Sequence, residues 1–169
     1  MKLLTCRNLS SGSFAEFGIV IDAAAMAPES INAGTTRRHA DLARLDLRGG
    51  DGDPVIGIYV ASARRFPLPL RVFEQHAQAS QVFLPLGSHR FVVAVAPGSG
   101  SPDWAGITAF ISAPGQGISL HRGCWHHGLI ALGEGDRFAV IEGGGYRKDT
   151  MEVCTPEGLE ISLAEPARG

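Results

Sequence analysis

The residues most able to do chemistry lie in one short run, His121 to His127, with the sequence HRGCWHH. The chain has six histidines in all, and three of them lie within these seven residues. Imidazole exchanges its proton near neutral pH and is the commonest metal ligand in proteins. The run therefore indicates a catalytic or metal-binding centre, and its alternative interpretation is a chance cluster.

The order of residues within the run limits what each can do. His126 and His127 are adjacent, so an extended strand would point them to opposite faces, and at most one of them can reach a given cavity. His121 and Trp125 could frame that cavity, with the Trp125 ring as an apolar wall. Cys124 has no base in sequence reach, and we interpret it as a packed thiol rather than a nucleophile.

A second polar group lies earlier in the chain. In a strand from 68 to 76 the period of two places Glu74 and His76 on one face with Leu70 and Val72. If this face lines an interior, a carboxylate and an imidazole enter it together, which is costly unless they are paired or bind a metal. The alternative is a simple polar pair at the wet end of the strand.

The spacing around this pair is similar to a known motif. Gln81 follows His76 by five residues, and the pattern Glu-x-His-x4-Gln resembles the first motif of cupins, which is usually His-x-His-x3–4-Glu. Glu74 and Gln81 both offer oxygen donors, which a nickel, manganese or iron site can accept. The second cupin motif needs a glycine turn before a strand that carries a histidine, and residues 114–121 fit it.

The elements that must position these residues are short strands. Twenty-two glycines and ten prolines separate apolar runs, which is typical of an all-β sandwich or barrel. We therefore predict a cupin-like β-barrel (double-stranded β-helix, or jelly roll) with one short N-terminal helix. Its capping box is Ser13 to Glu16, and Gly18 ends it. Strands are expected at 55–61, 68–76, 81–86, 91–96, 108–112, 118–121, 129–132 and 138–141.

Two connections are predicted as tight turns, and one segment as a loop. Residues 87–90 would join the strands on either side into a hairpin, and so would Gly133-Glu134-Gly135-Asp136. Residues 143–150 are polar and are expected to form a loop.

Size and composition narrow the class of protein. A length of 169 residues predicts one domain, 1–169. The net charge of −2 and scattered basic residues argue against nucleic acid. No apolar run approaches the ~18 residues of a membrane span, and the N-terminus turns polar too soon for a signal peptide. We expect a cytoplasmic protein with reduced cysteines, and a homodimer that buries an edge strand.

Taken together, the motifs resemble those of the ureidoglycolate lyase family, also described as ureidoglycolate hydrolase, over residues 14 to 138. The family cleaves (S)-ureidoglycolate to glyoxylate and urea in allantoin and purine catabolism. The most specific blocks are Glu-x-His-x4-Gln-x-Phe-x-Pro and His-Arg-x-x-Trp-His-His. The matching segments are Ile31–Thr35, Arg38 with Asp41 and Leu42, Glu74–Pro85, Val92–Ala96, Ala109–Phe110 and Gly115–His127.

The resemblance implies a role for each candidate residue. It implies a metal or polar centre that binds Ni²⁺ or another divalent ion, and a small-molecule substrate. His121 is the candidate acid–base. The implied metal ligands are Glu74, His76, Gln81 and His126. The implied catalytic residues are His121, His126, Glu74 and His76, and the implied substrate-binding residues are Asn32, Arg38, Gln81, Trp125 and Glu142.

Some positions depart from the family pattern. Relatives tend to have Asp-Arg-Gly-Gly where this chain has Glu142 followed by three glycines, so a guanidinium is missing unless Arg147 replaces it. His39-Ala40 also replaces an aromatic-His pair. Two alternatives stay open: another cupin metalloenzyme (a dioxygenase or isomerase) acting on a small hydroxy-carboxylate, and a non-catalytic module that binds a small carboxylate.

Overall fold

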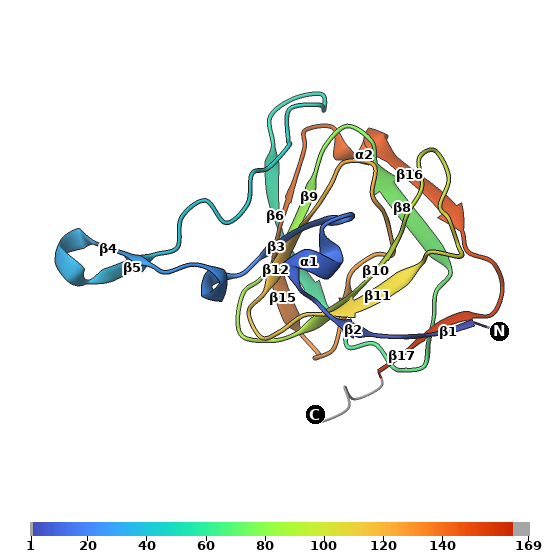
Figure 1. Cartoon of the computed structure of the whole chain (residues 1–169). Coiled ribbons are helices and arrows are strands. Elements are labelled where there is room, and N and C mark those ends of the chain that lie inside the picture. Colours follow the sequence, from blue (N-terminus) through green and yellow to red (C-terminus); the bar gives the residue numbers. More distant parts are fainter. Residues whose placement is uncertain (1, 164–169) are drawn as a thin grey trace.

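The computed structural model describes residues 2–163 as a β-rich molecule with two short helices (Figure 1). The helices are α1 (Ser11–Phe14) and α2 (Tyr146–Asp149), with 3-10 turns η1 (Ala23–Ala25) and η2 (Asn32–Gly34). The strands are β1 (Lys2–Thr5), β2 (Arg7–Asn8), β3 (Gly18–Ile21), β4 (Glu29–Ile31), β5 (Thr36–Arg38), β6 (Val55–Ala61), β7 (Leu68–Pro69), β8 (Val72–His76), β9 (Gln81–Pro85), β10 (Phe91–Ala96), β11 (Thr108–Ile111), β12 (Gly117–Leu120), β13 (Trp125–His126), β14 (Ile130–Ala131), β15 (Asp136–Glu142), β16 (Thr150–Cys154) and β17 (Leu159–Ser162).

Two sheets face each other and form the body of the molecule. The seven-stranded sheet has the order β16-β8-β13-β10-β11-β2, with β14 also paired to β10, and the five-stranded sheet has the order β3-β12-β9-β15-β6. The all-β prediction is confirmed, and the arrangement is consistent with a cupin-like fold. Within the described residues, the strand pairing does not join the two sheets into a closed barrel.

The alternation of side chains along β10 explains why the molecule has two cores. All six residues of β10 are buried. Phe91, Val93 and Val95 face the five-stranded sheet and pack with residues such as Phe138. Val92 and its alternate neighbours face the other way, where the three-stranded sheet β1-β17-β7 covers them. A strand buried on both faces reads as a continuous apolar run, as this one does.

One segment leaves the body. Between β3 and β6, the chain extends outward and returns through the antiparallel pair β4-β5, which stands away from the sheets at the left of Figure 1. Residues 23–38 are exposed throughout, with the exception of the half-buried Ile31. We call residues 22–39 the arm.

Several predicted boundaries need correction. The strand predicted at 68–76 is two strands, because the chain bends after Pro69, and Leu70 joins the second core instead of sharing a face with Glu74. The two predicted hairpins are wrong: β9 and β10 lie in different sheets, as do β14 and β15, so each connection crosses between layers. Strands β6 and β10 have the predicted bounds.

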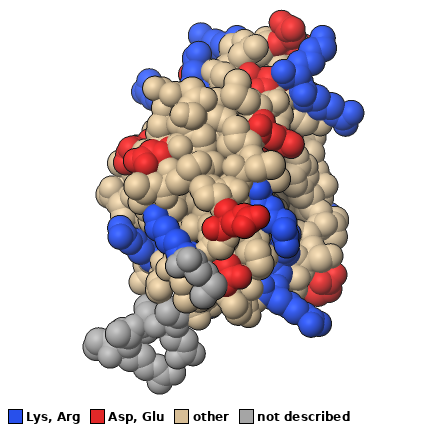
Figure 2. Space-filling view, turned by 90° about the vertical axis from the view of Figure 1, so that its right-hand side faces the viewer, with Lys and Arg blue, Asp and Glu red and all other residues tan. Residues whose placement is uncertain are grey.

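The helices also differ from the prediction. Helix α1 begins earlier than the predicted capping box, because Ser10 is the N-cap residue. Its hydroxyl accepts a hydrogen bond from the Ser13 backbone amide. The predicted loop at 143–150 contains the short helix α2. No helix among residues 2–163 has the length and apolar character to cross a membrane. On the side shown in Figure 2, acidic and basic side chains are intermixed.

Candidate active site

Strand parity brings one half of the site into the space between the sheets. On β8, Phe73 faces the second core, so Glu74 faces inward. On β13, Trp125 faces the second core, so His126 faces inward, and it lies directly opposite Glu74 across the strand pair. His76 follows Glu74 on the same face and is also buried. The expectation that Glu74 and His76 enter an interior together agrees with this placement.

The other half comes from the five-stranded sheet by the same rule. Phe83 and Phe138 belong to the inner core. Gln81 lies two residues before Phe83, and it pairs across the strands with Glu142. Tyr59 lies opposite Phe138 on β6 and therefore also faces inward. At this end of the molecule, the inner faces of both sheets change from apolar to polar.

The proton on the His126 ring can be located from its neighbours. His126 Nδ1 lies 2.9 Å from the carbonyl oxygen of Cys124, which can only accept. Nδ1 therefore carries a proton, and in the neutral ring Nε2 presents a lone pair. This Nε2 is buried, has no hydrogen-bond partner and lies 3.4 Å from Glu74 Oε1. A lone pair and a carboxylate oxygen repel at this distance unless a proton or a cation lies between them.

A similar chain of contacts fixes His76. The Thr150 hydroxyl donates to the carbonyl oxygen of Tyr146 at 2.9 Å. A hydroxyl has one proton, so its 3.3 Å contact with His76 Nδ1 must be one in which the imidazole donates. His76 Nε2 therefore also presents a lone pair, and it too is buried without a partner.

These three side chains fit a divalent metal ion. One ligand atom from each of Glu74, His76 and His126 lies within 4.8 Å of the other two. Neutral imidazoles held by a second hydrogen bond at Nδ1 are the usual form of histidine ligands, and two imidazoles with one carboxylate suit several transition metals. The observation that supports a metal ion here is that the Nε2 atoms of His76 and His126 are buried without a hydrogen-bond partner.

Electrostatics keep the cluster in its metal-binding form. The contact with His126 lowers the pKa of Glu74, against the opposing effect of burial. Burial lowers the pKa of His76, and a proton on the neighbouring His126 ring would lower it further. At neutral pH the carboxyl group is therefore ionised and the His76 ring is neutral, as metal ligation requires.

Glu142 is the best-supported polar group facing this cluster. Gln81 Nε2 donates to Glu142 Oε1 at 2.7 Å, and the Tyr59 hydroxyl lies 3.4 Å from Glu142 Oε2. Burial and the charge of Glu142 raise the pKa of Tyr59 to about 12, so the phenol keeps its proton and can donate. Gln81 Oε1 is buried without a partner and is free to accept from a ligand.

Helix α2 closes the end of the site that lies beside His76. Its last residue, Asp149, accepts the backbone amides of Ala77 and Gln78 at 3.1 and 2.9 Å, and so holds the turn that carries the chain from β8 to β9. Thr150 follows it directly. Sequence reasoning missed Tyr59, Thr150 and Asp149, because their roles depend on strand pairing and none belongs to a motif.

Two residues of the histidine run are not brought into the cluster. His121 is exposed, and its Nε2 lies 3.3 Å from the carbonyl oxygen of Ala15, beside a small surface pocket. Trp125 is fully buried in the second core, on the face of β13 opposite His126. His127 also lies on that side, with its ring against Phe73. The predicted roles of His121 and Trp125 remain predictions.

Asn32 and Arg38 also lie outside the cluster, on the arm. Asn32 bonds to Thr36 within the hairpin, and Arg38 forms an ion pair with Glu29. Both are exposed. In a single copy of the chain, Asn32 and Arg38 are therefore not placed to bind a substrate at the cluster, as the resemblance implies they do.

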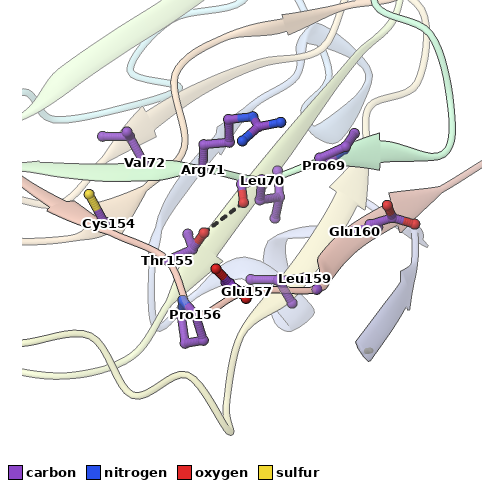
Figure 3. A pocket seen from close by; sticks show the side chains of 11 residues that line it. Pro69, Leu70, Arg71, Val72, Cys154, Thr155, Pro156, Glu157, Leu159 and Glu160 are labelled. Carbon is purple, nitrogen blue, oxygen red and sulfur yellow. Dashed lines mark hydrogen bonds between the residues drawn. The ribbon is translucent and has the colours of Figure 1, made fainter.

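A larger groove of about 530 Å³ lies elsewhere, between the start of β8 and the β16–β17 connection (Figure 3). Within the groove, the Thr155 hydroxyl donates a hydrogen bond to the carbonyl oxygen of Leu70. The groove contains no histidine and is open to solvent, so the polar cluster between the sheets is the better candidate for chemistry.

Known proteins are similar to this chain over almost its whole length. The chain is 38% identical to a ureidoglycolate lyase of Burkholderia mallei over 96% of its length and 95% of the relative. It is 37% identical to that of Stutzerimonas stutzeri, over 96% of each chain, and 39% identical to that of Rhodobacter capsulatus, over 95% of its length and 99% of the relative. Residues 1–162 match the sequence profile of the same group, and the chain therefore belongs to the ureidoglycolate lyase family.

Proposed function

We propose that this protein is a ureidoglycolate lyase, a single-domain enzyme that cleaves (S)-ureidoglycolate to glyoxylate and urea. The observation that carries the proposal is the inward cluster of Glu74, His76 and His126, with its two buried Nε2 atoms that have no hydrogen-bond partner. Family membership supplies the substrate, and the cluster supplies groups suited to a small oxygen-rich anion.

The reaction is the collapse of a carbinol attached to urea. A base removes the proton of the hydroxyl group, the C–O bond becomes a carbonyl, and the electron pair of the C–N bond goes to nitrogen. The nitrogen takes up a proton and leaves as urea. One carboxylate can accept the first proton and return it to the nitrogen, so no external reagent is needed.

Glu142 is the best-placed residue for this proton transfer. The Gln81 amide and the Tyr59 hydroxyl hold its two oxygens, which fixes its orientation toward the cluster. The exposed position of His121 makes it a weaker candidate than the sequence indicated. Tyr59 retains its proton and donates it in a hydrogen bond to Glu142 Oε2.

We further propose Ni²⁺ as the ion held by Glu74, His76 and His126. A divalent ion here would draw electrons from the hydroxyl oxygen and lower its pKa, which makes removal of the proton easier. We also propose that the protein is a homodimer in the cytoplasm. The three cysteines are free, and burial raises the pKa of Cys124 to about 12, so this thiol is unreactive.

The test is to incubate the purified protein with (S)-ureidoglycolate, with and without added nickel, and to measure glyoxylate as its phenylhydrazone. We expect production well above the spontaneous rate, and expect His126→Ala to reduce it to background. Arg90→Ala, an exposed change far from the cluster, should leave the rate unchanged. Glyoxylate at the spontaneous rate only, or oxygen consumption with bound iron, would contradict the proposal.

A further inference from the structure

The arm has a defined shape without support from its own chain. Every polar contact that the described residues make with residues 26–39 comes from within this stretch, such as the ion pair of Arg38 with Glu29 and the contact of His39 with the carbonyl oxygen of Met26. An isolated two-stranded hairpin is only marginally stable in water. The arm therefore requires something to pack against.

The tip of the arm points to the same need. Asn32, Ala33 and Gly34 all have positive φ angles, of 52°, 54° and 89°. A left-handed conformation costs roughly 1–2 kcal/mol for a residue with a Cβ atom, and such conformations persist where surrounding contacts impose them. Among residues 2–163, none outside the hairpin contributes a hydrogen bond to this tip, although Asn32 and Thr36 bond within it.

The body offers an uncovered surface on the same side. The seven-stranded sheet is covered on its outer face by β1, β17 and β7, whereas the outer face of the five-stranded sheet is apolar and open along its edge strand β6. Ile56, Ile58 and Val60 point outward there and are 68%, 50% and 68% exposed. A sheet face that meets water is normally polar, so a row of three exposed β-branched side chains indicates a covered surface.

A second copy of this chain is the occupant that fits both features. The arm belongs to the segment between β3 and β6, and Figure 1 shows the arm and β6 on the same side of the molecule. A two-fold axis on that side lets each copy receive the arm of the other on its own open face. The apolar arm residues Met26 and Ile31 then have an apolar surface to meet.

The acidic groups of the site indicate what the arm could contribute to it. If the proposed function holds, the substrate is a carboxylate, yet the described groups that face the cluster from β15 and α2 are the acids Glu142 and Asp149. Arg147 of α2 interacts electrostatically with Glu142 and Tyr59, but its guanidinium is fully exposed and lies over the Tyr146 ring. A guanidinium that binds the substrate carboxylate through paired hydrogen bonds would balance this charge.

Strand β5 carries two adjacent arginines, Arg37 and Arg38, which project to opposite faces of the hairpin. β6 bears both the open row on its outer face and Tyr59 on its inner face. An arm that crosses β6 is therefore next to the mouth of the site. We propose that the arm of one copy packs over β6 of a second copy and directs one of its two β5 arginines into the active site of that copy.

The interface is tested first, by light scattering on the intact protein after size-exclusion chromatography. A dimer is expected for the wild type, and Ile58→Glu is expected to shift it to monomer with an unchanged far-ultraviolet spectrum. Arg90→Ala serves as the surface control. A monomeric wild type, or a dimer that Ile58→Glu leaves intact, overturns the proposal whatever the enzyme's activity proves to be.

The shared site is tested by complementation. The arm variant Arg37→Ala/Arg38→Ala is expected to lose about 10- to 100-fold in kcat/KM, the usual cost of a lost charged hydrogen bond. It is co-expressed with His126→Ala under a different tag, and heterodimers are isolated with both tags. In a heterodimer the intact arm of one chain meets the intact cluster of the other, so about half of the wild-type activity per dimer is expected.

Heterodimer activity no higher than that of the arm variant alone would show that each arm serves its own chain, and would overturn the proposal. Full activity of the arm variant would also overturn it. The two proposals fail separately: a wild type that makes no glyoxylate contradicts the lyase function, whereas an active wild type without complementation contradicts only the shared site.

Discussion

The position of two imidazole protons decides what this site can bind. Backbone and hydroxyl oxygens receive the Nδ1 protons of His126 and His76, and this leaves both Nε2 lone pairs directed toward the Glu74 side of the cluster. The sequence indicated which histidines to consider. It could not indicate their tautomers, because Thr150 reaches His76 only through the pairing of β16 with β8.

Replacing Thr150 tests this arrangement. In Thr150→Val the His76 Nδ1 proton loses its acceptor, so the ring can rotate or change tautomer. We expect nickel affinity, measured by isothermal titration calorimetry, to fall about 10- to 100-fold, as is typical when a partner of a metal ligand is lost. Thr150→Ser retains the hydroxyl group and should retain most of the affinity. Equal affinity of the valine variant and the wild type would contradict the tautomer assignment.

Replacing Glu142 separates proton transfer from metal binding. Glu142→Gln preserves the size of the side chain and removes its basicity, so kcat should fall by roughly 10²- to 10⁴-fold, the range for loss of a general base. Nickel affinity should change little, because Glu142 lies outside the triad. Glu157→Gln, on the exposed β16–β17 connection, is the control. An unchanged kcat would return the proton-carrier role to another residue such as His121.

The pH dependence of metal binding has a definite sign. Because the pKa of His76 is lowered from its ordinary 6.5, the folded protein binds fewer protons than the unfolded chain in the range just below that value. The contribution of His76 to the free energy of unfolding is therefore complete above pH 6.5. It decreases below this pH, where His76 takes up a proton in the unfolded chain before it does so in the folded protein. Metal competes with the same protons. In the presence of nickel, the Tm measured by thermal unfolding should fall as the pH is lowered from 7 to 5. A Tm that does not change over this range would contradict the expected pH dependence.

At the scale of elements, the site depends on strands that change layers. The sequence predicted most strands, because apolar runs bounded by glycine and proline are a local signal. It failed at the connections: residues 87–90 look like a hairpin turn, but β9 and β10 pair with other strands in different sheets. Which layer a strand joins depends on long-range packing. The arm was missed because its short strands β4 and β5 have no apolar period.

The loop between β15 and α2 shows how closely these elements pack. A Cβ atom on Gly144 would overlap the backbone of Gly52, so the two loops touch main chain to main chain. Gly144→Ala should lower the free energy of unfolding by about 1–3 kcal/mol, as overpacking does, and reduce activity by shifting Glu142. Gly12→Ala, which has open space around its Cβ position, is the matched control. Chemical denaturation measures the free energy of unfolding of both variants. If Gly144→Ala is as stable as Gly12→Ala, the loop accommodates the added methyl group and the prediction is wrong.

At the scale of the whole molecule, the site joins the two sheets. Glu74, His76 and His126 come from one sheet, and Gln81 and Glu142 come from the other. Polar side chains occupy space between the layers that apolar ones fill elsewhere, so this end of the molecule holds buried groups that need a ligand. A bound ion should therefore stabilise the entire fold.

Nickel at 100 times its dissociation constant should add ~2.7 kcal/mol to the free energy of unfolding, which corresponds to a rise in Tm of roughly 5–10 °C for a domain of this size. Differential scanning fluorimetry with and without nickel measures it. His126→Ala should show no such rise. A wild-type Tm that does not respond to nickel would mean that the cluster is not a nickel site.

The parallel pairing of β1 with β17, which aligns Lys2 with Leu159, has a consequence for how the protein is made. Strand β1 is synthesised well before β17 and must wait for this partner. Until then the outer side of the seven-stranded sheet, with Val92 and Trp125, lacks its cover. The order of synthesis thus leaves an apolar surface open during translation, which is a natural point for chaperone binding. A circular permutant that joins these parallel strands through a crossover linker of about a dozen residues would shorten that interval.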